Sequence, residues 1–310
     1  MISRRQVLAN VSQLCLLGAL TPAQVHAQTG LMQRTVPKTG ERLPVIGLGT
    51  YRTFNVADNP AELDPLKQVI DLFFQHGGTV VDSSPAYGPS EAAFGYLSQQ
   101  IDLPNNLFVA TKVRADGRDQ GISQMDASPQ KMGVEKIDLM QVHSLADWQT
   151  QLPILKERKA QGIYRYIGIT ASREELYEDF IDIMQREPLD FIQINYSVAE
   201  RKAEEVILPL AMDRGMAVFI NRPFAAGALF PYVENKVLPD WAAEFDCHSW
   251  GQFFLKFILA HPAVTVALQA TSSPVHLVDN LKAGQGILPN EELRQRMVDL
   301  IGLTGLPPWT

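Results

Sequence analysis

The chain has 310 residues, of which 46% are hydrophobic and 20% are charged, and its formal net charge is −7. This composition is typical of a globular protein and excludes a disordered chain. The negative balance argues against nucleic acid as a partner. The two cysteines, Cys15 and Cys247, are too few for a disulfide framework or a zinc cluster, so we expect no metal.

The first 28 residues have the features of an export signal. Arg4 and Arg5 precede residues 7–20, a mostly apolar run without an acid or a lysine, and Ala27 ends a small-residue segment. The pattern Ser-Arg-Arg-x-x-Leu resembles a bacterial twin-arginine (Tat) signal. The apolar run is too short to span a bilayer as a stable helix. We expect export to the periplasm by the Tat machinery, cleavage after Ala27 and no stable membrane anchor, the alternative being a basic amphipathic N-terminus.

The rest of the chain, residues 29–310, is predicted to form a single α/β domain. A short β-hairpin with a turn at residues 38–40 comes first. Short apolar runs then alternate with segments of helical period. The runs are 45–50, 79–84, 107–113, 137–143, 164–170, 190–197, 217–223 and 264–270. Apolar strands separated by helices indicate a parallel sheet, and eight such units favour a closed (β/α)8 TIM barrel over an open doubly wound sheet.

The helical segments carry ordinary end signals, with glycine at positions 77, 162 and 215. Residues 117–133 form a weaker helical pattern, and the chain closes with a predicted helix from about residue 290 and a short tail. No Gly-x-Gly-x-x-Gly follows the first strand, so a Rossmann site is not indicated.

Four polar residues lie at or just after the ends of three predicted strands. The second, third and fourth predicted strands end at Asp82, Lys112 and His143, within those runs, and Tyr87 lies in the loop after the second strand. In a barrel of this kind the active site lies at the carboxyl ends of the strands. Each residue has a simpler explanation: a turn cap for Asp82, an ion-pair partner for Lys112, a core histidine and a structural tyrosine for the others.

Together, the four residues permit one kind of chemistry. A free phenol has a pKa near 10 and is a poor acid at neutral pH. A neighbouring ammonium stabilises the phenolate and lowers that pKa, and a carboxylate keeps the amine charged. A neutral imidazole can donate a hydrogen bond to a carbonyl oxygen. The set therefore predicts a proton donor aimed at an oxygen that becomes negative as hydride reaches carbon.

Residues 82–91, which include the sequence AYGPSE, and the motifs ATK, QVH, GIYRYIGIT, IQINYS and HLVDNL resemble those of the aldo/keto reductase superfamily, over roughly residues 35–281. The resemblance implies a (β/α)8 barrel and NADPH-dependent reduction of a small carbonyl substrate without metal. It implies that Tyr87 is the general acid, that Lys112 and Asp82 depress its pKa, and that His143 orients the carbonyl.

The same resemblance implies a cofactor site around the strand ends. Its expected residues are Gly49, Thr50, Tyr51, Thr170, Gln193, Asn221, Arg222, Pro223, Phe224, Thr271, Ser272, Ser273 and Asn280. Gln193 matches the glutamine that binds the nicotinamide carboxamide in the family. Arg222 is a candidate contact for the pyrophosphate.

The cofactor side also departs from the family pattern. Ala171 replaces the usual Asn, and Asn221 to Phe224 replace a stacking Tyr and Ser-Pro-Leu. Ala270 and His276 stand where many members have a Lys and an Arg that grip the 2′-phosphate. NADH is therefore an alternative to NADPH, and residues 271–273 are either phosphate ligands or only a helix N-cap.

Three functional hypotheses follow. The first is an exported NAD(P)H-dependent reductase of aldehydes or ketones. The second is a nucleotide-binding accessory barrel with little or no turnover, motivated by the missing cations and the missing stacking Tyr. The third, a Schiff-base lyase using Lys112, is disfavoured because Asp82 keeps the amine protonated. Tyr51, Trp148 and Trp309 are candidates for an aromatic substrate wall, or else packing residues.

Overall fold

The computed structural model describes residues 30–56 and 60–302. The predicted signal with Arg4, Arg5 and the cleavage point at Ala27 lies outside the described residues, as does Trp309. Within the described part, no helix combines the length and the apolarity needed to cross a membrane.

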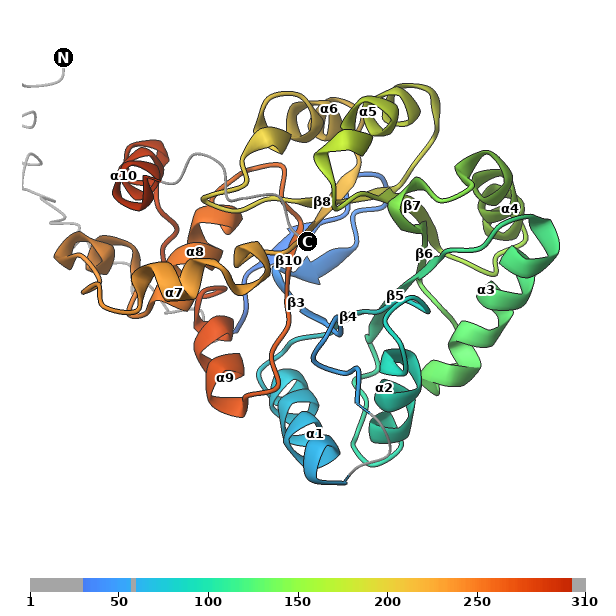
Figure 1. The fold of residues 1–310 in the computed structure, drawn as a ribbon, viewed down its shortest axis with the longest axis horizontal. Helices are drawn as coiled ribbons and strands as arrows, with labels where there is room; N and C mark the ends of the chain where they lie inside the picture. Colours follow the sequence, from blue (N-terminus) through green and yellow to red (C-terminus); the bar gives the residue numbers. More distant parts are fainter. Residues whose placement is uncertain (1–29, 57–59, 303–310) are drawn as a thin grey trace, which may run out of the picture.

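A closed parallel barrel forms the centre of the molecule, ringed by helices (Figure 1). Its strands follow the chain order β3 to β10, and β10 closes the ring by pairing with β3, so that Ala267 lies opposite Ile46. The strands are β3 (Ile46–Gly49), β4 (Val80–Asp82), β5 (Phe108–Val113), β6 (Leu139–Val142), β7 (Tyr166–Thr170), β8 (Phe191–Asn195), β9 (Ala217–Asn221) and β10 (Val266–Gln269). Each of the eight predicted runs contains one of them, which confirms the TIM barrel.

The barrel interior is filled by side chains and closed below by the predicted hairpin. Strands β1 (Gln33–Thr35) and β2 (Arg42–Pro44) pair antiparallel. The turn between them ends at Gly40, whose φ of 77° is accessible to glycine at little cost. One apolar cluster joins hairpin residues to inward-facing strand residues; its members include Val36, Leu43, Val80, Phe108, Leu139, Phe191, Phe219 and Val266. The interior is therefore a packed core, as expected of this fold.

The helices cover the outer face of the barrel and bury a second, larger apolar layer against it. They are α1 (Pro60–Gln75), α2 (Ser90–Ser98), α3 (Arg118–Met132), α4 (Trp148–Ala160), α5 (Tyr177–Arg186), α6 (Ile207–Asp213), α7 (Leu229–Val233), α8 (Trp250–Leu259), α9 (Pro274–Lys282) and α10 (Glu291–Ile301). The weakly predicted segment does form α3, which ends on Gly133 in the left-handed conformation.

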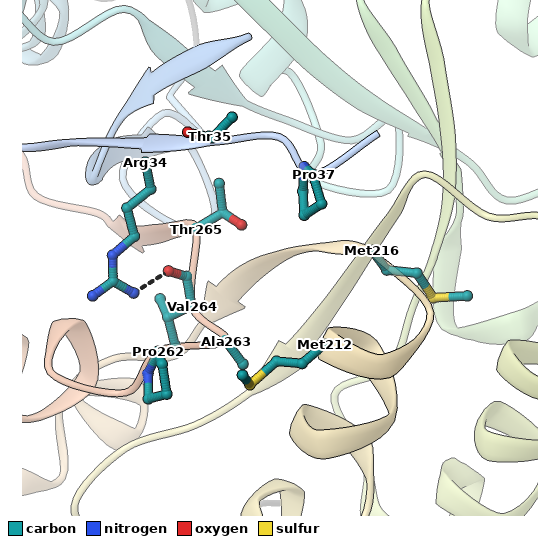
Figure 2. A pocket seen from close by; sticks show the side chains of 9 residues that line it. All are labelled: Arg34, Thr35, Pro37, Met212, Met216, Pro262, Ala263, Val264 and Thr265. Atoms are coloured by element: carbon teal, nitrogen blue, oxygen red, sulfur yellow. Dashed lines mark hydrogen bonds between the residues drawn. The ribbon is translucent and has the colours of Figure 1, made fainter. Parts of the chain in front are cut away.

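A cavity of about 260 Å³ lies between the hairpin and the amino-terminal side of the barrel. Figure 2 shows Arg34 from β1 reaching the backbone near Val264, just before β10. The Arg34 guanidinium also donates to the carbonyl of His261, 2.7 Å away. These bonds hold the hairpin against the bottom of the barrel, at the opposite end from the carboxyl ends of the strands.

Candidate active site

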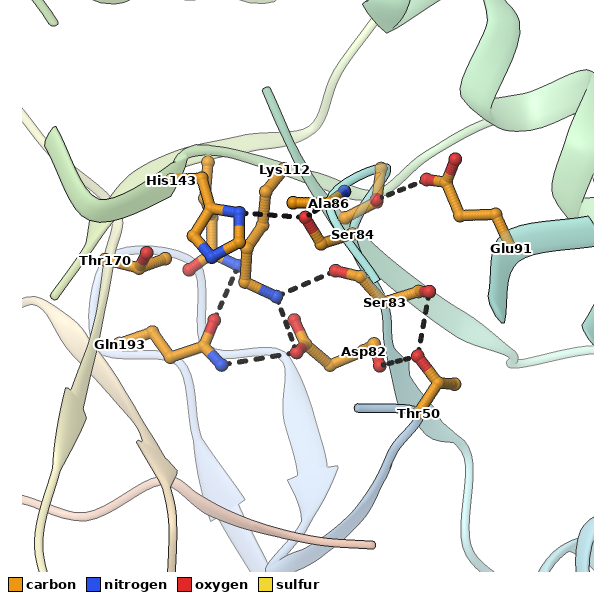
Figure 3. Close-up of polar contacts among 12 residues, drawn as sticks. Thr50, Asp82, Ser83, Ser84, Ala86, Glu91, Lys112, His143, Thr170 and Gln193 are labelled. Atoms are coloured by element: carbon orange, nitrogen blue, oxygen red, sulfur yellow. Dashed lines mark hydrogen bonds and ion pairs between the residues drawn. The ribbon is translucent and has the colours of Figure 1, made fainter. Parts of the chain in front are cut away.

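The barrel brings the four predicted catalytic residues together at one rim. Asp82 is the last residue of β4, Lys112 lies near the end of β5, and His143 directly follows β6. Tyr87 lies in the loop that joins β4 to α2. Because β4, β5 and β6 are neighbours in the barrel, these ends are adjacent, and Figure 3 shows Asp82, Lys112 and His143 grouped there.

Lys112 and Asp82 form a buried ion pair. The Lys112 Nζ lies 2.7 Å from Asp82 Oδ2 and also donates to the carbonyl of Ser83, 2.7 Å away. Burial by itself lowers the pKa of Lys112, but the Asp82 carboxylate raises it, and the net direction is upward. Burial raises the pKa of Asp82, and the ammonium opposes that shift. We assign the proton to Lys112, since an amine is intrinsically far more basic than a carboxylate.

Tyr87 packs over this pair. The Lys112 Nζ lies 5.1 Å from the centroid of the phenol ring. The ring also contacts Tyr51, at a centroid distance of 4.9 Å, and His143 edge-on at 5.6 Å. The phenol is thus bounded by one cation and two rings.

The expectation of a depressed Tyr87 pKa is wrong for this structure. Burial raises the pKa of Tyr87 above its ordinary value, and Lys112 lowers it only in part. The main reason is desolvation of the buried phenol, and the Asp82 carboxylate also disfavours a second anion nearby. Tyr87 therefore keeps its proton at neutral pH.

His143 is neutral in the folded protein. Burial lowers the pKa of His143 to about 3, and the positive charges of Lys112 and Arg114 act in the same direction. Its Nδ1 lies 2.9 Å from the hydroxyl of Ser84. An imidazole in this state donates or accepts hydrogen bonds but carries no charge.

Two amides extend the network beneath the ion pair. The Gln141 Nε2 donates to Gln193 Oε1 at 3.0 Å, and the Gln193 Nε2 donates to Asp82 Oδ2 at 3.2 Å. Sequence reasoning did not single out Gln141. The usable signal was an amide inside the apolar run 137–143, because a polar side chain there is buried, as Gln141 is, and needs a partner. Both ends of the predicted carboxamide ligand, Gln193, are thus engaged within the protein.

The predicted residues of β3 and β7 lie at the same rim. Thr50 follows Gly49, and its hydroxyl donates to Ser83 Oγ at 2.8 Å. The next residue, Tyr51, is 49% exposed beside Tyr87. Thr170 ends β7, and its hydroxyl accepts a bond from the backbone N–H of Ser144 at 3.0 Å.

The segment after β9 has an unusual backbone. Arg222 has a φ of 52°, which is uncommon for a residue other than glycine. Its guanidinium lies 3.8 Å from the carboxylate of Glu200. Asn221 and Pro223 flank it, and Phe224 is buried against Phe230 with ring centroids 5.0 Å apart. Phe224 therefore serves packing in this structure.

The loop after β10 leads directly into α9. The Ser273 hydroxyl accepts from the backbone N–H of His276, so the N-cap alternative for this segment is present. Thr271 accepts from the N–H of Ser273, with Ser272 between them. Asn280 is buried in α9, and its amide donates to Gln269 at 3.1 Å, which ties the helix to β10.

Comparison with known proteins gives the family. The family model described as "Aldo/keto reductase family" matches residues 45–296. The chain belongs to the aldo/keto reductase family. It is 26% identical over 214 residues to the aldo-keto reductase YhdN of Bacillus subtilis, which covers 63% of this chain and 62% of that protein. It is 24% identical over 288 residues to L-galactose dehydrogenase of Arabidopsis thaliana, covering 82% and 88%.

Solved structures of this family share the fold. An aldo/keto reductase from Klebsiella pneumoniae, in complex with NADP and acetate, superposes with a TM-score of 0.72 at 22% identity, over 86% of this chain and 94% of that one. The holo form of AKR11C1 from Bacillus halodurans gives a TM-score of 0.69 at 19% identity, over 90% and 98%.

Buried polar atoms near the strand ends fit a dinucleotide. Among the residues that the structure describes, three buried amide atoms at the last positions of β8, β9 and β10 have no hydrogen-bond partner: Asn195 Oδ1, Asn221 Oδ1 and Gln269 Nε2. Buried polar atoms normally have partners. Two acceptors and one donor on neighbouring strands suit a ligand that carries amide, hydroxyl and phosphate groups.

Proposed function

We propose that this family member is an exported NAD(P)H-dependent oxidoreductase that reduces aldehydes and ketones to alcohols, with Tyr87 as the general acid. The observation that carries the proposal is the buried Lys112–Asp82 pair beside the Tyr87 ring. Residues 29–310 would form the enzyme domain, and the substrate would be a small carbonyl compound.

The side chains of the protein supply one proton to the substrate and stabilise the group that donates it. A reduced nicotinamide, when bound, supplies hydride to the carbonyl carbon. The raised pKa keeps Tyr87 protonated, so it can donate to the oxygen that becomes negative. Donation leaves a phenolate, which the Lys112 ammonium stabilises only once it has formed. An interaction that strengthens as the reaction proceeds lowers the barrier, because it stabilises the transition state more than the bound substrate.

We assign His143 the role of hydrogen-bond donor to the carbonyl oxygen of the substrate. A neutral imidazole donates a hydrogen bond that orients the carbonyl toward Tyr87 without competing as an acid. The raised pKa of Lys112 argues against the lyase hypothesis, because a Schiff base requires the neutral amine.

The proposed cofactor is NADPH, with NADH as the alternative. A structural neighbour was crystallised with NADP, and an NADH-specific methylglyoxal reductase from Escherichia coli is 29% identical over 129 residues. Thr170, Asn221, Arg222 and residues 271–273 would hold the dinucleotide. Gln193 already bonds to Gln141 and Asp82, and it would contact the carboxamide with its remaining N–H and lone pair.

Reduction is tested directly with the purified chain. With an aromatic aldehyde it is expected to oxidise NADPH, and Tyr87→Phe is expected to abolish that activity. Tyr96→Phe is the matched control, because Tyr96 is an exposed tyrosine on α2. Equal rates for the Tyr87→Phe variant and the control would refute the general-acid role.

The accessory hypothesis keeps one structural observation in its favour. Gln193, the expected carboxamide ligand, already makes one hydrogen bond at each end of its amide, to Gln141 and to Asp82. Calorimetry that detects dinucleotide binding, together with no consumption of NADPH or NADH over a panel of aldehydes and ketones, would favour the accessory hypothesis over the reductase.

Export is a separate part of the proposal. It rests on Arg4, Arg5 and the apolar run that follows them. The variant with Arg4→Lys and Arg5→Lys is expected to stay in the cytoplasm as the uncleaved precursor, as measured by fractionation. Continued periplasmic export of that variant would refute the Tat assignment.

A further inference from the structure

The hydroxyl of Ser84 connects His143 to the loop that carries Tyr87. The Ser84 Oγ lies 2.9 Å from His143 Nδ1 and accepts a hydrogen bond from the backbone N–H of Ala86 at 3.1 Å. The Ser84 carbonyl accepts from the backbone N–H of Tyr87 at 3.0 Å. One side chain therefore contacts the imidazole and the loop of the proposed acid together (Figure 3).

The single hydroxyl proton of Ser84 decides the direction of the bond to His143. The Ala86 N–H can only donate, so Ser84 Oγ accepts there. If His143 Nδ1 also donated to Ser84 Oγ, the Ser84 proton would need another acceptor, and among the described residues no further contact of Oγ is present. Ser84 is fully buried, so bulk solvent does not reach its hydroxyl. A buried donor without an acceptor is costly, which favours donation from Ser84 to Nδ1.

We propose that Ser84 is a positioning residue that holds His143 as the tautomer with its proton on Nε2. Figure 3 shows the second ring nitrogen turned away from Ser84. In that tautomer His143 presents an N–H donor to a carbonyl oxygen. The charged groups near the ring, Lys112 and Arg114, are both cationic and disfavour a doubly protonated imidazole. The catalytic consequence rests on the proposed reduction, whereas the tautomer itself does not.

The tautomer is measured without substrate or cofactor. The purified chain, labelled with ¹⁵N-histidine, is expected at pH 7 to show a protonated Nε2 and an unprotonated Nδ1 for His143, with the signals assigned by their loss in His143→Gln. A protonated Nδ1, or an imidazolium at that pH, would overturn the proposal. This result stands whether or not the chain reduces any carbonyl compound, so it separates this inference from the proposed function.

Variants of Ser84 test the consequence for turnover. Ser84→Ala removes the donor and is expected to shift the His143 nitrogen signals and lower kcat/KM by about tenfold or more. Ser84→Thr keeps a hydroxyl and is expected to restore both. Ser98→Ala is the matched control, because Ser98 is a buried serine whose hydroxyl donates to the Gly95 carbonyl. Unchanged His143 signals in a folded Ser84→Ala variant would overturn the proposal; if that variant does not fold, the wild-type tautomer still decides it.

Discussion

The Nζ of Lys112 lies 2.7 Å from Oδ2 of Asp82, and the two side chains are only 1% and 4% exposed. Water stabilises neither charge at such a depth, so each depends on the other. The pair holds the cation beside Tyr87, where it lowers the pKa of the phenol, but burial raises that pKa by more. Asp82 therefore positions the amine, whereas the raised pKa of Tyr87 comes mainly from burial.

Breaking the pair is expected to destabilise the fold as well as the site. Asp82→Asn leaves the Lys112 ammonium buried without a counter-charge, which should lower the free energy of unfolding by about 3–5 kcal/mol. Urea denaturation measures this change. Asp182→Asn is the control: Asp182 pairs with Arg186 at the surface, where the two side chains are 52% and 69% exposed, and its loss should cost at most about 1 kcal/mol. Equal effects of the two substitutions would contradict the account of the buried pair.

The rate of reduction should depend on the proton of Tyr87. Burial raises the pKa of this phenol above its ordinary value of 10.0, so the acid is present through neutral pH and is lost only as pH rises through that higher pKa. We expect a plateau in kcat from neutral to mildly alkaline pH. Lys112→Met should slow the reaction by about 10²-fold, because the phenolate left after donation is no longer stabilised. A kcat that already falls with rising pH at about 8 to 9 would contradict the assignment.

His143 should make stability depend on pH in mildly acidic solution. Its pKa falls from 6.5 to about 3 on folding, so between these values the unfolded chain binds a proton that the folded chain does not. Stability therefore decreases as pH falls below 6.5. His143→Gln should make the free energy of unfolding less dependent on pH between about 6.5 and 4. His76→Gln, at an exposed site, is the matched control for loss of a histidine.

Glu91 should change the pH dependence of stability in the direction opposite to that of His143. Its carboxyl is buried and accepts a hydrogen bond from Thr111, at 2.7 Å, which ties α2 to β5. Burial raises the pKa of Glu91 above 4.5, so stability present below pH 4.5 is lost as pH rises through the folded pKa. Glu91→Gln keeps the acceptor without the charge. We expect its melting temperature, measured by calorimetry, to depend less on pH above 4.5 than that of the wild type.

A close helix contact offers a test of packing near the site. A Cβ added to Gly95 of α2 would lie 2.0 Å from the backbone carbonyl of Lys131 in α3. Because backbone cannot yield as a flexible side chain does, Gly95→Ala should cost about 2–3 kcal/mol of stability despite its better helix propensity. An increase in melting temperature would show that the two helices separate freely.

Local patterns in the chain were enough to predict the barrel, its hairpin and the four residues at the rim. Apolar runs and helical periods are local features, and parallel strands necessarily bring Asp82, Lys112 and His143 to one end. Only the folded molecule fixes the partners: Gln141 reaches Gln193, and Ser84 reaches His143, across strand pairings that no local pattern specifies. The fold also fixes the direction of the Tyr87 pKa, because desolvation depends on every element packed around a group, whereas a motif shows only which charges accompany it.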